Sequence, residues 1–342
     1  MTEEEIVKKN IIDWDIPSPT QQYTVLIHCS TYNHGQYIKD ALNGFVMQKT
    51  NFPFCAIIID DASTDNTPEI IKEFAHKYPE IIKPILLQEN HMQHGKKRDP
   101  YFIPWHNSAK YIAQCEGDDY WIDPLKLQKQ VDLLEKNLDV GLCFTDFNRL
   151  FQNKNKIETN LLKSNPRDFP SSFKSLDEWL LLKAYVGPMT WCYRRDTINM
   201  FPTVNSLDGS FVLFSHFLAN SKVICMKNET TAVYRHHDGG VSHPNSELKI
   251  YERTRNLFTT QLKLADLYKD KLISYQKTRE AICYNYFGSL YYILLYGTQA
   301  EIDEAVSFLG KNKNYKHKVM IFLNSSKVGR TIMKFIRRFF YR

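Results

Sequence analysis

The chain has 342 residues, of which 43% are hydrophobic and 24% are charged, and this balance excludes a disordered or fibrous protein. Its formal net charge of +6 arises at the end of the chain, since residues 311–342 contain ten Lys and Arg and no Asp or Glu. The seven cysteines are scattered and form no CxxC pair, which argues against a disulfide scaffold or a zinc site.

Apolar runs bounded by turn residues alternate with helical patterns along the first two thirds of the chain. This alternation predicts an α/β fold, with a mostly parallel sheet flanked by helices. From about residue 245 the pattern is helical to the end. Residues 91–106 and 152–172 are expected to be loops, the first of them basic. The expected strands are 24–29, 56–59, 81–87, 111–115 and 141–145, and the expected helices are 37–45, 67–77, 125–136 and a segment near 175–182.

Polar residues follow three of these strands at their carboxyl ends, where sheets of this kind bind ligands. The strongest pattern is Glu116-Gly-Asp-Asp-Tyr-Trp121. Three carboxylates within four residues repel one another unless a cation or hydrogen-bond donors are present. A divalent ion such as Mg²⁺ or Mn²⁺ prefers oxygen ligands, so a metal site is one interpretation. An exposed acidic turn before the next helix is the other.

Two further patterns follow the first and second strands. Asp61 ends a buried apolar run, and we favour ligand recognition there, because a carboxylate would accept the imide N–H of a base such as uracil. For Asp65 we favour a turn that leads into the next helix. After the first strand, Ser30 and Tyr32 offer a hydroxyl and an aromatic ring that could hold and stack a base, although a tyrosine such as Tyr32, taken singly, is more often a packing residue.

Together these patterns resemble the family-two glycosyltransferases with the GT-A (Rossmann-like) fold, over about residues 23–242. The run Tyr111–Gln130 is similar to members that build bacterial capsule and lipopolysaccharide chains. The resemblance implies an inverting transfer of a sugar from a nucleotide-sugar donor, in particular a UDP-sugar, to a hydroxyl of a glycan or lipid-linked glycan, with Mn²⁺ or Mg²⁺ as cofactor. The alternatives are a sugar-phosphate nucleotidyltransferase and a non-catalytic sugar-binding scaffold.

The resemblance also assigns roles to residues. Asp208, at the start of an apolar helix, would be the general base, and its alternative role is to stabilise the N-terminus of that helix. His237 is a metal or phosphate candidate, because the two glycines at 239 and 240 permit a close approach of the backbone. These roles require Asp61 and Asp118 to lie at one edge of the molecule. The nucleotide-binding residues would be Ser30, Tyr32, Asp61 and Asp118, and the metal-binding residues would be Glu116, Asp118, Asp119 and His237.

The pattern of the last segment of the chain, residues 318–342, predicts a separate function. Apolar residues recur at helical spacing from Val328 to Phe339, and basic residues from Lys327 to Arg338 fall on another face. This pattern is typical of a helix that lies in a membrane interface, and a helix docked on the domain is the alternative. We therefore expect contact with an anionic membrane surface through residues 318–342, and a cytoplasmic protein that is peripheral at the inner face of the cell membrane. Nucleic acid is not expected as a partner, because the rest of the chain is acidic. The expected domains are an N-terminal extension (1–22), a GT-A transferase domain (23–244) and a helical C-terminal region with a basic tail (245–342).

Overall fold

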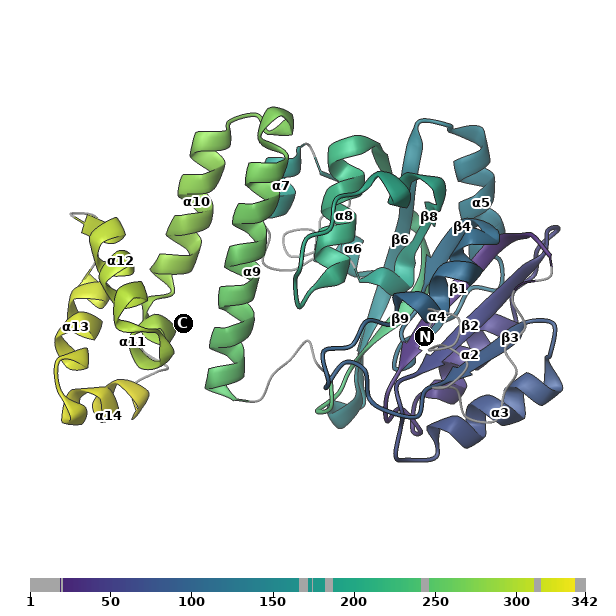
Figure 1. The fold of residues 1–342 in the computed structure, drawn as a ribbon, viewed down its shortest axis with the longest axis horizontal. Helices are drawn as coiled ribbons and strands as arrows, with labels where there is room; N and C mark the ends of the chain where they lie inside the picture. The colour runs from purple at the N-terminus through teal and green to yellow at the C-terminus, as the bar shows by residue number, and fades with distance from the viewer. Residues whose placement is uncertain are drawn as a thin grey trace, which may run out of the picture. The chain divides into compact units, whose positions relative to one another are not determined.

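The computed structural model describes residues 19, 21–165, 172–173, 175–181, 187–240, 246–310 and 315–335. The chain forms two compact units, and each is built from several segments (Figure 1). The predicted boundary between residues 244 and 245 stays a prediction. The first unit consists of Met1–Phe173, Lys183–Pro202 and Asn220–His237, and the second of Lys174–Leu182, Thr203–Ala219 and Asp238–Arg342.

A mixed sheet forms the centre of the first unit. Its described strands have the order β3-β2-β1-β4-β8-β6-β9-β5, and β7 pairs with β6. The strands from β3 to β4 are parallel, β8 runs antiparallel to β4 and β6, and β9 is parallel to β6. The predicted α/β class is thereby confirmed. The strands are β1 (Tyr23–Thr31), β2 (Phe54–Asp60), β3 (Ile82–Leu86), β4 (Ala109–Gln114), β5 (Tyr120–Trp121), β6 (Val140–Phe151), β7 (Lys156–Glu158), β8 (Trp191–Arg194) and β9 (Lys222–His236).

The parallel strands are apolar because they lie inside the unit. In β2, the six residues from Cys55 to Asp60 are all buried, as expected for a strand that is covered on both faces. The register of the parallel pairs aligns their carboxyl ends, since Thr31 of β1 lies beside Asp60 of β2. On the other side of β1, His28 lies beside Gln114 of β4. The loops that follow β1, β2 and β4 therefore begin at one edge of the sheet.

Helices of the first unit connect these strands. The helix α3 begins with Pro68 in its first turn, a position where the missing N–H of proline costs nothing. The segment expected to be a basic loop contains α4, so that part of the prediction was wrong, and residues 152–165 hold β7 and a short helix rather than a continuous loop. The helices are α2 (Ile38–Val46), α3 (Thr67–Lys77), α4 (Asp99–Asn107), α5 (Lys126–Lys136) and α6 (Leu161–Ser164), with 3-10 turns η1 (Gln152–Lys154), η2 (Pro188–Thr190) and η3 (Asp196–Met200).

Lys126 of α5 is a fully buried lysine in the first unit. Its Nζ donates a hydrogen bond of 2.5 Å to Oε1 of Gln130 and lies 4.5 Å from the centroid of the Trp121 ring. Burial lowers the pKa of Lys126 to about 8, from an ordinary value of 10.5. The hydrogen bond and the aromatic ring therefore offset only part of the cost of removing this charge from water.

We expect Lys126→Met to change how stability depends on pH. Between about pH 8 and pH 10.5 the unfolded wild-type chain binds more protons than the folded chain, so its free energy of unfolding rises with pH over that window. The variant lacks this contribution. The unfolding free energy of the variant minus that of the wild type should therefore fall by about 1 kcal/mol from pH 7 to pH 9 in urea titrations. The exposed Lys136→Met is the control, and a difference that stays constant with pH would contradict the prediction.

The second unit is helical in its described part. The long helices α9 and α10 lie side by side (Figure 1). Its core is rich in tyrosine, and Tyr251 donates hydrogen bonds of 3.1 and 3.0 Å to the carboxylate of Glu301. Among the described residues of the chain, none of the helices has the length and apolar character needed to cross a bilayer. The helices are α7 (Leu176–Leu180), α8 (Gly209–Asn220), α9 (Glu247–Leu267), η4 (Lys269–Lys271), α10 (Tyr275–Gly288), α11 (Leu290–Tyr296), α12 (Gln299–Leu309), α13 (Tyr315–Asn324) and α14 (Lys327–Phe335).

Candidate active site

The ends of β2 and β4 meet on either side of β1. The backbone N–H of Asp61 donates to the carbonyl of Thr31 (3.0 Å), and the N–H of Gly117 donates to the carbonyl of Ser30 (3.0 Å). Asp61 and the acidic turn that contains Asp118 therefore flank consecutive residues of one strand. The predicted meeting of these strand ends at one edge of the sheet is confirmed.

Gly117 is required where these segments approach. A Cβ atom at this position would lie 2.5 Å from Oγ1 and 2.7 Å from Cβ of Thr31, far inside van der Waals contact. Thr31 is itself buried, so its side chain has little room to move. Any larger residue at 117 would push the acidic turn away from β1.

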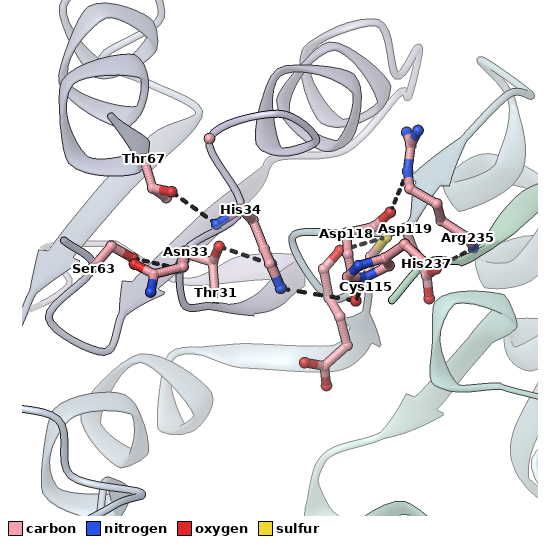
Figure 2. Close-up of polar contacts among 12 residues, drawn as sticks. Thr31, Asn33, His34, Ser63, Thr67, Cys115, Asp118, Asp119, Arg235 and His237 are labelled. Atoms are coloured by element: carbon pink, nitrogen blue, oxygen red, sulfur yellow. Dashed lines mark hydrogen bonds and ion pairs between the residues drawn. The ribbon is translucent and has the colours of Figure 1, made fainter. Parts of the chain in front are cut away.

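The loop after β1 is held by the loop after β2 (Figure 2). Asn33 adopts a positive φ of 53°, a conformation that asparagine tolerates better than most residues. Its N–H donates to Oγ of Ser63, and its Oδ1 accepts from the N–H of Thr64, each at 2.8 Å. Asp65 accepts from the N–H of Gly35 (2.9 Å) and from the N–H of Thr67 (3.0 Å). The turn predicted at Asp65 is thus found, and it also fixes the neighbouring loop.

Asp61 is buried, and both of its carboxylate oxygens accept hydrogen bonds from a backbone. Oδ1 accepts from the N–H of His91 (2.8 Å) and Oδ2 from the N–H of Met92 (3.1 Å). Asp61 therefore ties the end of β2 to the segment after β3. A carboxylate oxygen has more than one lone pair, so contact with a base N–H is still chemically available, and the predicted role stays a prediction.

Ser30 and Tyr32 precede and follow Thr31, the residue whose carbonyl accepts the backbone hydrogen bond from Asp61. Both are half-buried. Oγ of Ser30 lies 3.3 Å from Nε2 of His28, whose Nδ1 lies 2.9 Å from Nε2 of His106. Burial lowers the pKa of His106 to about 4, and it also lowers that of His28, so both rings are neutral at pH 7. Neutral rings can both donate and accept hydrogen bonds, which suits contact with a nucleoside, and that role of Ser30 and Tyr32 stays a prediction.

Three potential metal ligands converge beside the acidic turn: Asp118, His237 and His34 (Figure 2). Nε2 of His237 lies 3.1 Å from Oδ2 of Asp118, and Nε2 of His34 lies 3.8 Å from the same oxygen. The ligand atoms of all three lie within 4.8 Å of one another. Two imidazoles and one carboxylate form a donor set that suits a divalent cation, so the residues present fit such an ion.

The electrostatics of this cluster favour the forms that bind metals. Burial raises the pKa of Asp118, but the hydrogen bond with His237 and the electrostatic interactions with the two imidazoles outweigh that effect, so the net pKa is below the ordinary value. Burial lowers the pKa of His34 and outweighs the opposing effect of Asp118. An ionised carboxylate beside a neutral imidazole is the ligand state that metals require.

Glu116 and Asp119 do not belong to this group of three. Among the described residues, it is the group of side chains whose spacing could hold a metal ion. Asp119 is buried, and its Oδ1 accepts a hydrogen bond of 2.8 Å from the backbone N–H of Arg235. Burial, together with the charge of Asp118, raises the pKa of Asp119 well above its usual range. The Glu116 side chain reaches solvent, yet the protein around its carboxyl group and the charge of Asp118 raise its pKa to about 7. Metal ligation by Glu116 and Asp119 stays a prediction.

Arg235, near the end of β9, holds the acidic turn against the sheet. Its Nε donates to the backbone carbonyl of Asp118 at 2.8 Å, and its backbone binds Asp119 as described. The guanidinium lies 4.9 Å from the ring centroid of Tyr37 and 5.0 Å from that of Tyr120. Both distances are in the range of cation–π attraction.

The two remaining nitrogens of Arg235 reach other segments. Nη2 donates to Oδ2 of Asp40 in α2 at 2.6 Å, and Nη1 donates to Oε1 of Gln152, just after β6, at 2.8 Å. The side chain of Arg235 is only 5% exposed. One buried cation thus joins the acidic turn, α2, η1 and β9.

Asp208 belongs to the second unit, where it precedes α8. Its Oδ1 accepts a hydrogen bond of 3.0 Å from the N–H of Phe211, which is a helix-capping contact, and its Oδ2 lies 3.6 Å from Nη2 of Arg253. The side chain is 18% exposed. The capping role that the sequence offered as the alternative is therefore present, and the role of Asp208 as a general base stays a prediction.

Comparisons with known proteins identify the class of this protein. A crystal structure of residues 1–349 of TarS from S. aureus, in complex with UDP-GlcNAc, has a TM-score of 0.55 and 16% identity, and the match covers 92% of each chain. This likeness establishes the GT-A fold. Residues 27–198, just over half of the chain, match the family described as Glycosyl transferase family 2. The chain belongs to that family.

Two curated relatives are similar to this chain in sequence. An uncharacterized protein of Mycobacterium tuberculosis is 37% identical over 217 residues, which cover 62% of this chain and 59% of that protein. This chain therefore spans about three fifths of the length of its mycobacterial relative. An uncharacterized glycosyltransferase of Escherichia coli, YibD, is 25% identical over 279 residues, which cover 78% of this chain and 77% of the relative.

Proposed function

We propose that this protein transfers a sugar from a nucleoside-diphosphate sugar, a UDP-sugar in particular, to a hydroxyl of a glycan or lipid-linked glycan acceptor in the synthesis of cell-surface polysaccharide. The observation that carries the proposal is the contact between Asp118 and His237 at the end of β1, where the backbone of Asp61 is bonded to the same strand. Membership of glycosyl transferase family 2 supports glycosyl transfer. The UDP-GlcNAc bound to TarS, a protein of the same fold, supports a UDP-sugar donor.

The proposed roles follow the chemistry of each group. Ser30, Tyr32 and Asp61 bind the nucleoside, and Asp118 with His237 holds a divalent cation, Mn²⁺ or Mg²⁺. When bound, such a cation neutralises the charge that develops on the departing diphosphate. Asp208 accepts the proton of the acceptor hydroxyl while that oxygen forms its bond to the anomeric carbon and the bond to the diphosphate breaks. Attack opposite the leaving group inverts the configuration at that carbon.

A donor-hydrolysis assay tests this proposal. The purified protein is incubated with a panel of UDP-sugars and other nucleotide sugars, with Mn²⁺, with Mg²⁺ or with EDTA, and released nucleoside diphosphate is measured. We expect release with at least one donor, and only when a metal is present. Metal-dependent binding without any release would favour a sugar-binding scaffold. Formation of pyrophosphate from a nucleoside triphosphate and a sugar 1-phosphate would favour a nucleotidyltransferase.

The exposed face of α14 supports a second part of the proposal, which is contact with the anionic inner surface of the cell membrane. Gly329 and Met333 are buried and hold the helix on the second unit. Val328, Ile332 and Phe335 share another stripe and are 71%, 44% and 85% exposed. A third stripe carries Lys327, Arg330 and Lys334, and all three are exposed. The apolar stripe is therefore not the one used for docking, which supports the membrane interpretation. Residues 336–342 lie outside the described residues.

Removing the basic stripe should weaken membrane binding. With Lys327, Arg330 and Lys334 replaced by Gln, we expect binding to vesicles that contain anionic phospholipid to fall about 100-fold, since each basic residue contributes about 1 kcal/mol. Vesicle sedimentation measures the bound fraction, and vesicles of neutral phosphatidylcholine provide the reference. Replacing Val328, Ile332 and Phe335 by Ser should also lower binding, at both high and low salt. Equal binding by wild type and both variants would contradict the membrane contact.

A further inference from the structure

We propose that His34 is a third protein ligand of the divalent cation, and that this second imidazole makes the site select Mn²⁺ over Mg²⁺. The inference rests on the proposed function, which places a cation at Asp118 and His237. It adds His34, which lies in the loop after β1. The sequence patterns did not identify this residue as a candidate ligand.

The His34 ring is oriented toward Asp118 by its own neighbours (Figure 2). Nδ1 of the ring lies 3.1 Å from Oγ1 of Thr31, and the backbone N–H donates to Oγ1 of Thr67 at 2.9 Å. When Nδ1–H donates to Thr31, the lone pair of the neutral ring is on Nε2, the nitrogen that faces Asp118. This is the arrangement in which metal-binding histidines occur, with the second nitrogen held by a hydrogen bond.

The spacing of the three ligand atoms fits one shared cation. At a bond length of about 2.1 Å, two ligands at a right angle lie about 3.0 Å apart and two opposite ligands about 4.2 Å apart. Asp118 and His237 are separated by 3.1 Å, and His34 and Asp118 by 3.8 Å. Both distances fall between these limits, and the ligand atoms of all three residues lie within 4.8 Å of one another, so a small shift of the His34 ring would place all three around one ion.

The position of His34 is fixed before any ligand binds. The residues on either side of it, Asn33 and Gly35, are hydrogen-bonded to Ser63, Thr64 and Asp65 of the loop after β2. A loop held in this way loses little conformational freedom when its side chain coordinates a metal. This contact is local to the two loops, so it does not depend on a change elsewhere in the protein.

The donor set determines the preferred ion. Mg²⁺ favours oxygen ligands and keeps several of its waters, whereas imidazole nitrogen favours first-row transition metals. With His237 alone, the site would present one nitrogen among oxygen ligands and the diphosphate of the donor. Adding His34 makes nitrogen the majority of the protein ligands, which increases the affinity for Mn²⁺ more than the affinity for Mg²⁺.

Electron paramagnetic resonance of Mn²⁺ bound to the whole 342-residue chain with UDP tests the inference. Spin-echo modulation by ¹⁴N counts the imidazoles that are bonded to the ion, and we expect two in the wild type and one in His34→Gln. We also expect the Mn²⁺ affinity of His34→Gln to fall at least about 10-fold, with the Mg²⁺ affinity, measured by competition, within about threefold of wild type. His76→Gln, at an exposed position of α3, is the matched control and should match the wild type.

The outcomes separate this inference from the function on which it rests. A single imidazole in the wild-type spectrum, or equal Mn²⁺ affinity in wild type and His34→Gln, would show that His34 is not a ligand. If Asp118→Asn nevertheless loses Mn²⁺ binding, the proposed function remains intact. No Mn²⁺ binding by the wild type with UDP would overturn both. If His34→Gln does not fold, Thr31→Val is measured in its place, and it should lower Mn²⁺ affinity at least about threefold; unchanged affinity would count against the orienting contact.

Discussion

Asp118→Asn should reduce sugar transfer by at least about 100-fold, which corresponds to about 2.7 kcal/mol of lost transition-state stabilisation. The substitution keeps the size of the side chain and an oxygen that can accept the hydrogen bond from His237, so the fold should be retained. It removes the negative charge that attracts the cation. The Mn²⁺-dependent rise in melting temperature with UDP should disappear together with transfer.

The measurement for Asp118→Asn combines thermal unfolding with a steady-state assay. Asp132→Asn, at an exposed position of α5, is the matched control because it removes the same charge outside the site. Wild-type transfer rates in Asp118→Asn would show that the cation site is assigned to the wrong residue. A loss of the folded state, seen by circular dichroism, would instead point to a structural role of the carboxylate.

Asp208→Asn should leave donor binding intact and reduce transfer by about 10²–10⁴-fold, the usual contribution of a positioned base. Asparagine caps helices as well as aspartate does, so the hydrogen bond from the N–H of Phe211 should persist and α8 should remain stable. The amide cannot accept a proton from the acceptor hydroxyl. The expected result is therefore a low kcat with an unchanged UDP-dependent thermal shift.

Rate against pH separates the two roles that Asp208 can have. If Asp208 is only a capping residue, Asp208→Asn should transfer sugar at the wild-type rate, and that result would remove it from the mechanism. Asp303→Asn, at an exposed position of α12, is the control for loss of one carboxylate from the second unit. An acidic limb in the wild-type profile that is absent from the residual activity of the variant would support the role as a base.

The parallel part of the fold could be predicted from the sequence because its signal is local. The run from Ala56 to Ile59 is apolar and bounded by turn residues, and β2 contains it with two more residues before it and one after. The helix α3 was predicted to within one residue of its observed bounds, since Pro68 marks its start. Asp61 and Asp118 were identified for the same reason, because each follows such a strand within a few residues.

Other elements carry weaker local signals. In α4 the two prolines, Pro100 and Pro104, and a basic stretch before them hide the helical periodicity. Strand β9 is partly exposed for much of its length, and the polar residues from Lys227 to Thr231 interrupt its apolar pattern. Its pairing with β6 includes register shifts that no local pattern specifies. These elements form because of tertiary contacts. The sequence pattern of a single segment carries no information about such contacts.

In the candidate site too, some residues have a local sequence signal and others do not. His237 was identified because glycines follow it, but its partner Asp118 lies 119 residues away along the chain. His34 was missed because nothing in its own segment distinguishes it from other polar loop residues. The position of His34 depends on contacts between two loops, because residues of the loop after β1 are hydrogen-bonded to side chains of the loop after β2 and the reverse. Those contacts become visible only when the two segments are considered together.

The four-way contact of Arg235 gives a practical criterion for tracing this site in diverged relatives. A lysine has one nitrogen and no planar fork, so it could replace only one of the contacts to Asp40, Gln152 and the carbonyl of Asp118. Drift at this position would leave these acceptors without their donor and would loosen the acidic turn. Paired retention of an arginine here and an acid at the place of Asp40 would therefore mark relatives whose turn keeps its shape, even where the acidic residues themselves have changed.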